Sequence, residues 1–317
     1  MTGLELTVVV PTFERSHGLA ALFEALDSQT LDHDRFEVVI VDDASTDETD
    51  QVLRRLAGEA GFHVTVARLN RNGGQARARN HGLDLASGEI IAFTDDDCLP
   101  QPGWLAAGLA EMRDGAAVVV GEVQPPPGSR IGPFTRVLRV TAASHFQTAN
   151  VFYRREDLLR VGGFDVEFRA FGGEDTELGY RVVGRDRSAT FSPLALVYHP
   201  VRPDRLRVAL ALAARWIDLP LVVKRHPWLR DRLAHRRIFW KPSHQHLLMS
   251  ILALFIGPAW WPGFALMVPF AIHRVRTAMG FESTRDRARS LLGGSLVDLV
   301  ELLAMVRGSI RHRTLLL

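Results

Sequence analysis

The amino-acid sequence predicts an α/β fold, with a mainly parallel sheet between helices, over its first 120 residues. Three observations lead to this prediction. Short β-branched runs alternate with amphipathic stretches, the runs are apolar throughout, and polar clusters follow them directly. Continuous apolar strands separated by helices are typical of a parallel sheet that is covered on both faces. In such sheets ligands bind at the carboxyl ends of the strands, so the residues that follow each strand are the candidates for function.

The apolar runs predict four strands, and the stretches between them predict three helices. In the first helix Leu19, Leu22 and Leu26 recur at helical spacing and form one apolar stripe. The predicted strands cover residues 6–10, 36–41, 64–68 and 90–94, and the predicted helices cover residues 19–28, 47–57 and 75–85. Beyond Gly121 the pattern loosens, and a further strand-like run covers residues 189–197.

Charge divides the 317 residues into two parts, although the whole chain has a formal net charge of only +2. Residues 1–200 carry 19 basic and 29 acidic side chains, whereas residues 201–317 carry 19 and 7. We therefore predict an α/β domain at residues 1–203 and a helical, basic and apolar extension at residues 204–317, facing different partners. A single cysteine excludes a disulfide scaffold and a Cys-rich zinc site.

Polar residues follow every predicted strand of the first 120 residues. The second strand is followed by Asp42 and Asp43, the third by a glycine pair that includes Gly74, and the fourth by residues 95–97. Each cluster also has an ordinary structural use, since Asp and Ser cap helices and glycine pairs form turns. Taken one at a time, the clusters after the second and third strands favour that structural interpretation.

The run of three aspartates at residues 95–97 is harder to explain structurally, because adjacent carboxylates repel one another unless a cation compensates them. Mg²⁺ and Mn²⁺ take such oxygen ligands and share them with substrate phosphates. Arg79 and the backbone amides near Gly74 could meet the remaining phosphate charge, and Asp42 or Asp43 could accept hydrogen bonds from a base or ribose. The pattern indicates a metal-bound nucleotide diphosphate.

A second carboxylate pair, Glu174 and Asp175, lies in a glycine-rich, aromatic stretch directly before a predicted helix. A helix cap is the ordinary role for Asp175, and a general base that reaches an acceptor hydroxyl is the functional one. His199 ends the strand-like run, where a lone histidine is more often structural than a ligand.

Six segments of the chain, taken in order, resemble the family 2 glycosyltransferases of the GT-A fold. Each motif alone is weakly specific, but six in order over about two hundred residues form a specific pattern, and the resemblance covers residues 4–200. The segments are Val-Val-Pro-Thr-Phe-Glu-Arg (9–15), Val-Asp-Asp-Ala-Ser-Thr-Asp (41–47), Asn-Gly-Gly-Gln-Ala-Arg-Ala-Arg-Asn-His-Gly (72–82), Thr-Asp-Asp-Asp-Cys-Leu-Pro (94–100), Gly-Gly-Phe-Asp (162–165) and Gly-Glu-Asp-Thr-Glu-Leu (173–178).

This resemblance implies an inverting sugar transfer from a nucleotide-diphosphate donor, assisted by Mn²⁺ or Mg²⁺. It implies that Asp175, with Glu174 beside it, deprotonates the acceptor, and that the metal is held by Asp95, Asp97 and His199. Because three aspartates are adjacent, the division between metal and ribose contacts stays open. The implied nucleotide-sugar site comprises Pro11, Thr12, Glu14, Asp42, Asp43, Gly74, Arg79, Asp95 and Asp96. No Gln-x-x-Arg-Trp signature of processive synthases is present, so transfer of a single sugar is favoured.

The carboxyl-terminal third contains a stretch from His246 to His273 without Asp, Glu, Lys or Arg, which is long enough to span a bilayer. Two prolines, two glycines and two tryptophans at residues 257–263 break it, and both flanks are basic. We therefore predict that residues 246–273 associate with a membrane as a re-entrant or interfacial hairpin, with both ends cytosolic. The alternative is a buried helical pair in a soluble subdomain or at an oligomer interface.

The predicted protein acts at the cytoplasmic face of the cell membrane, since the first ten residues lack the basic and apolar regions of a secretory signal. We expect a lipid-linked or cell-envelope acceptor. The alternatives are a soluble glycosyltransferase with a small-molecule or protein acceptor, and a sugar-nucleotide-binding protein without turnover. Nucleic acid is not an expected partner, because the α/β part is acidic and an apolar block interrupts the basic tail.

Overall fold

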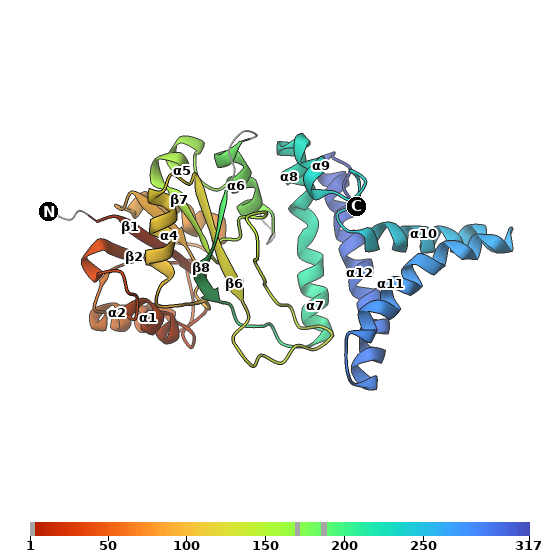
Figure 1. Cartoon of the computed structure of the whole chain (residues 1–317), viewed down its shortest axis with the longest axis horizontal. Coiled ribbons are helices and arrows are strands. Elements are labelled where there is room, and N and C mark those ends of the chain that lie inside the picture. Colours follow the sequence, from red (N-terminus) through yellow and green to blue (C-terminus); the bar gives the residue numbers. More distant parts are fainter. Residues whose placement is uncertain (1–3, 169–171, 185–188) are drawn as a thin grey trace. The chain divides into compact units, whose positions relative to one another are not determined.

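The computed structural model describes residues 4–168, 172–184 and 189–317 (Figure 1). The chain forms two compact units, which we call unit 1 and unit 2. Unit 1 consists of Met1–Gly128, Val137–Arg169 and Glu174–Pro200, and unit 2 consists of Ser129–Arg136, Ala170–Gly173 and Val201–Leu317.

Unit 1 is built on one sheet, and the part of the chain that the structure describes contributes eight strands to it. They are β1 (Leu6–Thr12), β2 (Phe36–Asp42), β3 (His63–Arg68), β4 (Ile90–Phe93), β5 (Leu99–Pro100), β6 (Val118–Gln124), β7 (Val151–Arg154) and β8 (Thr190–Tyr198). The order across the sheet is β3-β2-β1-β4-β7-β6-β8-β5. Strands β3, β2, β1 and β4 are parallel, as predicted. The other half is mixed, because β7 runs antiparallel to both β4 and β6 while β8 is parallel to β6.

The first two strands are buried at every residue, which is why their sequences are apolar runs rather than alternating ones. Two polar residues interrupt them and satisfy each other: the Thr7 hydroxyl donates to Glu37 Oε1 at 2.7 Å. The same carboxylate oxygen also accepts the backbone N–H of Ser87 at 2.7 Å. The pair therefore costs little, since buried polar groups are tolerated where they are hydrogen-bonded.

The helices of unit 1 cover this sheet. They are α1 (Leu19–Asp27), α2 (Thr49–Glu59), α3 (Gln75–Leu85), α4 (Trp104–Arg113), α5 (Arg155–Val161) and α6 (Glu174–Val183). A short 3₁₀ turn, η1 (His33–Arg35), precedes β2. The predicted stripe on α1 is buried. Helix α3 can lie directly on β1 because Gly82 has no side chain there: a Cβ at this position would be 2.5 Å from Val9 Cγ1.

Unit 2 is helical in the residues that the structure describes. Its long helices are α7 (Leu206–Ala213), α8 (Leu219–Arg225), α10 (Pro242–Ile256), α11 (Val268–Met279) and α12 (Thr284–His312). Shorter turns are η2 (Ala214–Asp218), η3 (Pro227–Leu229), α9 (Arg230–Leu233) and η4 (Trp261–Met267). The Ser283 hydroxyl caps α12 by accepting the N–H of Asp286 at 3.0 Å.

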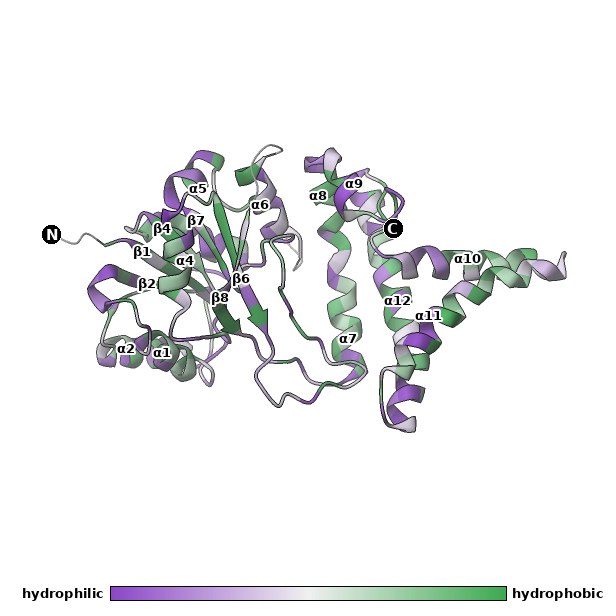
Figure 2. Ribbon diagram, viewed as in Figure 1, coloured by the Kyte–Doolittle hydropathy of each residue, from purple (hydrophilic) through white to green (hydrophobic). Residues whose placement is uncertain are grey.

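The structure does not support a membrane-spanning apolar extension at residues 246–273. The predicted break is present as η4, between α10 and α11, and association of this hairpin with a membrane stays a prediction. Among the described helices, none combines the length and the low charge that crossing a bilayer requires. Helix α10 has 15 residues and α11 has 12, against the roughly 20 that a bilayer core needs. Helix α12 has 29 residues but carries charged side chains along its length. Hydrophobic residues gather on α10 and α11 instead, near the end where the two helices meet (Figure 2).

Candidate active site

The predicted site residues of the first strands come together because β1, β2 and β4 are parallel and end at the same edge of the sheet. Thr12 and Asp42 end their strands side by side in register. The three adjacent aspartates follow β4 after one residue, Thr94. This edge is where α/β sheets of this kind bind their ligands.

Two of the three aspartates contribute to a group of side chains that could hold a metal ion. Ligand atoms of Asp95, Asp97, Cys98 and His199 all lie within 4.8 Å of one another. His199 Nε2 is 3.5 Å from Asp97 Oδ1. Although a hundred residues separate them, β5 pairs with the end of β8 (Leu99 with Tyr198) and so brings His199 to this edge.

The chemistry of this donor set fits Mn²⁺ or Mg²⁺. Two carboxylates and an imidazole are ligands that these hard or borderline ions accept in proteins. Burial, together with the charges of Asp95 and Asp97, raises the pKa of the Cys98 thiol well above its ordinary value. Thiolate ligands suit softer ions than Mg²⁺ or Mn²⁺, so Asp95, Asp97 and His199 are the metal-binding candidates for these ions.

Asp96 faces away from this group, toward β1. Its Oδ2 accepts the Thr12 hydroxyl at 2.7 Å. Burial raises the pKa of Asp96 to about 6, and the hydrogen bond from Thr12 and the charge of Arg15 only partly offset it. The structure thus separates the three adjacent aspartates by direction, which their sequence could not do.

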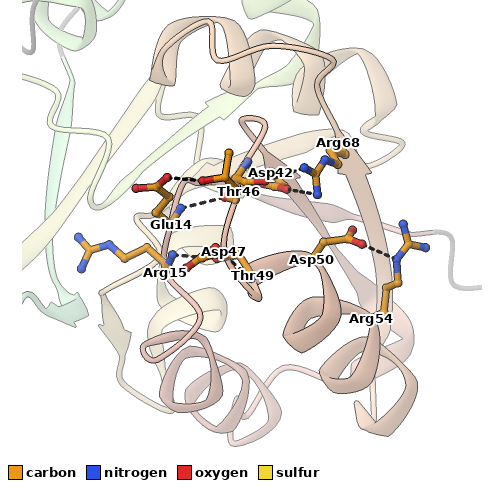
Figure 3. Close-up of polar contacts among 10 residues, drawn as sticks. Glu14, Arg15, Asp42, Thr46, Asp47, Thr49, Asp50, Arg54 and Arg68 are labelled. Atoms are coloured by element: carbon orange, nitrogen blue, oxygen red, sulfur yellow. Dashed lines mark hydrogen bonds and ion pairs between the residues drawn. The ribbon is translucent and has the colours of Figure 1, made fainter.

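Arg15 is a member of the site that the sequence analysis did not assign. Its NH2 group donates to Asp97 Oδ2 at 2.9 Å, and its Nε lies 3.5 Å from Asp96 Oδ1. The backbone of Arg15 is held by Thr49 Oγ1, which accepts its N–H at 2.9 Å (Figure 3). Arg15 therefore supplies positive charge to the same carboxylates that a divalent cation would use. The only sequence signal was its place in the first motif.

The loops after β1 and β2 are joined by hydrogen bonds and border an open pocket. Glu14, which adopts a left-handed conformation (φ 51°), donates its N–H to the Ser45 hydroxyl at 2.8 Å. Its Oε1 accepts the Thr46 hydroxyl at 3.0 Å (Figure 3). The pocket has a volume of about 740 Å³, within the usual range for small-molecule sites. It is lined by Glu14, Arg15, Ser16, His17, Gly18, Thr46, Asp47, Glu48 and Gln51.

Asp42, the last residue of β2, and Asp43, which follows it, both accept hydrogen bonds from backbone N–H groups of nearby loops. Asp42 is fully buried; its Oδ1 accepts the N–H of Ser45 at 3.0 Å, and its Oδ2 lies 3.3 Å from Arg68 NH1 (Figure 3). Asp43 accepts the N–H groups of Gly73 and Gly74 at 2.7 and 2.8 Å. The amide of Gly74, predicted to face phosphate, is therefore directed at Asp43.

Arg79 lies buried between the two carboxylate clusters, with 1% of its surface exposed. Its NH2 donates to Asp95 Oδ1 at 2.9 Å, and its NH1 lies 3.7 Å from Glu174 Oε1. Within the described part of the chain, its Nε and NH1 have no hydrogen-bond partner. Arg79 thus links the end of β4 to the start of α6 and keeps unused donors at the site.

A second contact, also not assigned from the sequence, fixes the segment around Gly-Gly-Phe-Asp. The Asn80 amide donates to the carbonyl of Phe164 at 2.9 Å and accepts its N–H at 2.7 Å. Gly163 has a φ of 67°, and a Cβ there would be 2.5 Å from Asn80 Oδ1. This docking places the Phe164 ring 5.6 Å from the Arg79 guanidinium carbon.

Asp175 lies within the first turn of α6, one residue after its start, and not at the capping position before it. Its Oδ1 accepts the N–H of Thr176 at 2.7 Å. Burial, followed by the charge of Glu174, raises the pKa of Asp175 to about 7. A carboxyl group with a pKa near neutrality can accept a proton under physiological conditions, which is what general base catalysis needs.

The fold and this site define an α/β protein with an acidic, metal-capable edge of its sheet. Residues 7–163 match the family model described as glycosyl transferase family 2, and residues 139–193 match the one described as N-terminal domain of galactosyltransferase. The chain belongs to glycosyl transferase family 2, and its unit 1 has the GT-A fold of that family.

Curated relatives point to the same family. The glycosyltransferase AglE of Haloferax volcanii is 27% identical over 246 residues, which cover 74% of this chain and 77% of that protein. The validoxylamine A glucosyltransferase of Streptomyces hygroscopicus subsp. jinggangensis is 33% identical over 284 residues, covering 78% of this chain and 65% of that protein. The chain thus spans less than two thirds of the second relative, and 28% of the chondroitin synthase of Pasteurella multocida.

Among solved structures, the chain is similar to the mannosyltransferase PcManGT from Pyrobaculum calidifontis, determined in complex with GDP-Man and Mn²⁺. The TM-score is 0.61 and the sequence identity 22%, over 98% of this chain and 87% of that one. At this identity the similarity shows the fold.

Proposed function

We propose that this chain is an inverting glycosyltransferase that moves one sugar from a nucleotide-diphosphate donor to an acceptor hydroxyl. The observation that carries the proposal is the pair of clusters joined by Arg79. One is a metal-capable group at the end of β4, and the other is a carboxyl group at the start of α6, Asp175, with a pKa of about 7. Displacement at an anomeric carbon needs positive charge on the leaving-group side and a base on the acceptor side.

In this reaction Asp175 takes the proton of the acceptor hydroxyl while the hydroxyl oxygen bonds to the anomeric carbon. The bond from that carbon to the diphosphate oxygen breaks, and the nucleoside diphosphate leaves. Asp95, Asp97 and His199 would hold Mn²⁺ or Mg²⁺, which when bound supplies positive charge to the leaving diphosphate. The pocket beside Glu14 and Arg15 supports a nucleoside site next to these carboxylates.

PcManGT, described as a complex with GDP-Man and Mn²⁺, supports the metal assignment, and S. aureus TarS 1-349, described as a complex with UDP-GlcNAc, supports a nucleotide-sugar donor. These descriptions leave the base of the donor open for this chain, since one donor carries guanine and the other uracil. They support a nucleotide sugar as donor and a divalent cation as the cofactor.

For the acceptor we propose a lipid-linked or cell-envelope molecule, in keeping with the apolar hairpin of unit 2. A small-molecule acceptor is the second candidate, because the 33%-identical relative is described as a validoxylamine A glucosyltransferase. Transfer assays with membrane lipid extracts and with soluble cyclitols and glycans distinguish the two. A product found only in the soluble fraction favours the second candidate.

The proposal is tested first by donor binding. A panel of nucleotide sugars with Mn²⁺ is screened for thermal stabilisation, because a donor present at about 100 times its Kd adds about 2.7 kcal/mol of stability. Nucleoside diphosphate release is then measured with the donor that binds. If no donor stabilises the chain, the proposed function is wrong.

The base is tested by Asp175→Asn. This variant is expected to keep donor binding and to lose about 10²- to 10⁴-fold in kcat, the usual contribution of a general base. Asp114→Asn, at an exposed carboxylate after α4, is the matched control and should keep full activity. Unchanged turnover in Asp175→Asn would contradict the assignment. Donor binding without any turnover in the wild type would instead favour the non-catalytic alternative.

A further inference from the structure

The hairpin of α10, η4 and α11 in unit 2 exposes large apolar side chains around its turn. We define the hairpin tip as residues 252–268. Seven of its large hydrophobic residues have between 44% and 81% of their surface exposed. They are Leu252, Leu254, Phe255, Trp260, Trp261, Phe264 and Val268. An exposed apolar cluster of this kind marks an interaction site on a soluble unit.

The tip is a folded turn, and its exposure does not come from loose packing. Its inner side is closed by two glycines: a Cβ on Gly257 would lie 2.5 Å from the ring of Phe264, and one on Gly263 would lie 2.9 Å from Ile256 Cγ2. The N–H of Trp260 bonds to the carbonyl of Ile256 at 2.9 Å, and that of Gly263 to the carbonyl of Trp260 at 2.8 Å. The apolar side chains outside this turn are therefore held outward by its geometry.

The chemistry of the tip suits lipid better than a protein surface. Residues 251–272 contain no charged residue and no Ser, Thr, Asn, Gln or His. Protein interfaces form about one hydrogen bond per 100–200 Å² and have a polar rim, which this surface cannot supply beyond the indole N–H of Trp260 and Trp261. Acyl chains require no hydrogen bonds, and tryptophan is favoured at the boundary between acyl chains and headgroups.

The length of the apolar part fits one leaflet. On α11 the first exposed charge after the tip is that of Arg276. At 1.5 Å per residue it lies about 12 Å along the helix from Val268. The hydrocarbon core of a bilayer is about 30 Å thick, so one leaflet accounts for about 15 Å. A tip inserted to this depth would leave Arg276 at the headgroups, and no helix would cross the bilayer.

We propose that the hairpin tip docks unit 2 onto an anionic phospholipid bilayer by inserting into a single leaflet. The preference for anionic lipid follows from charge, since residues 201–317 carry 19 basic and 7 acidic side chains. This surface lies outside the predicted sugar-transfer site, and the proposal stands independently of the proposed reaction.

The test is co-sedimentation of the purified full-length chain with vesicles of phosphatidylglycerol and phosphatidylcholine, and with vesicles of phosphatidylcholine alone. The wild type should bind the anionic vesicles. It should bind the neutral vesicles at least about fivefold more weakly. The triple variant Phe255→Gln, Trp260→Gln and Trp261→Gln should bind at least tenfold more weakly. A matched triple variant in unit 1, Leu85→Gln, Leu159→Gln and Leu194→Gln, also replaces exposed apolar residues and should bind like the wild type.

Equal vesicle binding by the tip variant and the wild type would overturn the proposal. The proposal would also be overturned if the wild type did not bind vesicles and sedimented as a dimer while the tip variant was monomeric. A second copy of the chain would then cover the tip. Sedimentation velocity separates these outcomes. Neither measurement uses a sugar donor, so failure of the proposed transfer reaction would not affect the result.

Discussion

Two buried carboxylates, one in each unit, differ in how their surroundings treat them. Burial raises the pKa of both. At Asp175 in unit 1 the charge of Glu174 raises it further, to about 7. At Glu301 in unit 2 the hydrogen bond from His244 and the charge of Lys241 outweigh burial and lower the pKa below its ordinary value. The surroundings of Glu301 on α12 therefore stabilise its charged form, whereas those of Asp175 on α6 favour its protonated form.

The ion pairs show the same contrast. In unit 2, Asp298 is paired with Arg274 at 3.2 Å, and Asp218 is hydrogen-bonded to His312 at 3.0 Å. In unit 1 each arginine of the site contacts two carboxylates, Arg15 those of Asp96 and Asp97, and Arg79 those of Asp95 and Glu174. Clusters whose pKa values are displaced in this way are typical of functional sites. The contrast is clearest between Asp175 and Glu301: the surroundings of Glu301 stabilise its charged form, and those of Asp175 disfavour it.

The largest expected effect comes from removing a carboxylate of the metal-capable group. Asp97→Ala should weaken Mn²⁺ binding more than about 100-fold, because even the outer partners of a metal ligand contribute 10- to 100-fold. Donor binding that depends on Mn²⁺, and sugar transfer with it, should fall to background. Mn²⁺ titration followed by electron paramagnetic resonance measures the affinity directly.

The control for this experiment is Asp84→Ala, which removes an exposed carboxylate of α3. It should bind Mn²⁺ like the wild type. If Asp97→Ala retains donor binding that a chelator abolishes, the metal is held elsewhere. The assignment of the metal to the carboxylates after β4 of unit 1 would then be wrong.

The second prediction concerns stability against pH, where Asp175→Asn and Glu301→Gln should behave oppositely. The folded-state pKa of Asp175 is raised from 3.8 to about 7, so its charge destabilises the fold increasingly as pH rises from about 4 to 7. Asparagine removes that charge and should stabilise unit 1 at pH 8, with no effect below pH 4. About three pKa units set a ceiling of about 4 kcal/mol, and we expect about 2 because Glu174 shares the effect.

Glu301 has the opposite sign. Its folded-state pKa is lowered from 4.5, so its stabilisation is present above pH 4.5 and is lost as pH falls through that value and below. Glu301→Gln should therefore destabilise unit 2 at neutral pH by about 1.5–3 kcal/mol, the range for hydrogen bonds to charged groups, and much less in acid. Thermal unfolding of both variants between pH 3 and 8 checks the two slopes. Slopes of the same sign would remove the distinction between the units.

The sequence predicted the parallel half of the sheet well because three of its four strands, β1, β2 and β4, are buried along their full length and so read as apolar runs. In the mixed half it predicted β8, as the run at residues 189–197, but not the short β7 or the strand pairing, which is set by contacts between distant segments. The last helix, α12, begins at Thr284 because Ser283 caps it. Its first turns are polar, and an apolar pattern misses them.

The sequence predicted which residues form the site, but not the directions in which their side chains point. The six motifs identified its residues, yet only the pairing of β5 with β8 brings His199 to Asp97. Adjacent aspartates look alike in a sequence, while the structure turns Asp96 toward Thr12 and the other two toward the metal-capable group. For residues 246–273 the sequence predicted a broken hairpin instead of a single crossing, and the structure has the break as η4, between two helices that are each too short to span a bilayer.

The smallest predicted effect concerns Arg15, whose charge competes with a metal for the same carboxylates. Its guanidinium is about one third exposed, so each ion pair contributes about 1 kcal/mol at most. Arg15→Gln removes this competing cation and should tighten Mn²⁺ binding about three- to tenfold in the absence of donor, measured by the same titration. Arg54→Gln, which breaks an exposed pair with Asp50 on α2, is the matched control and should change nothing. If Arg15→Gln instead weakens Mn²⁺ binding, Arg15 organises the carboxylates for the ion and does not compete with it, and unit 1 would then resemble unit 2 in pairing its charges for structure.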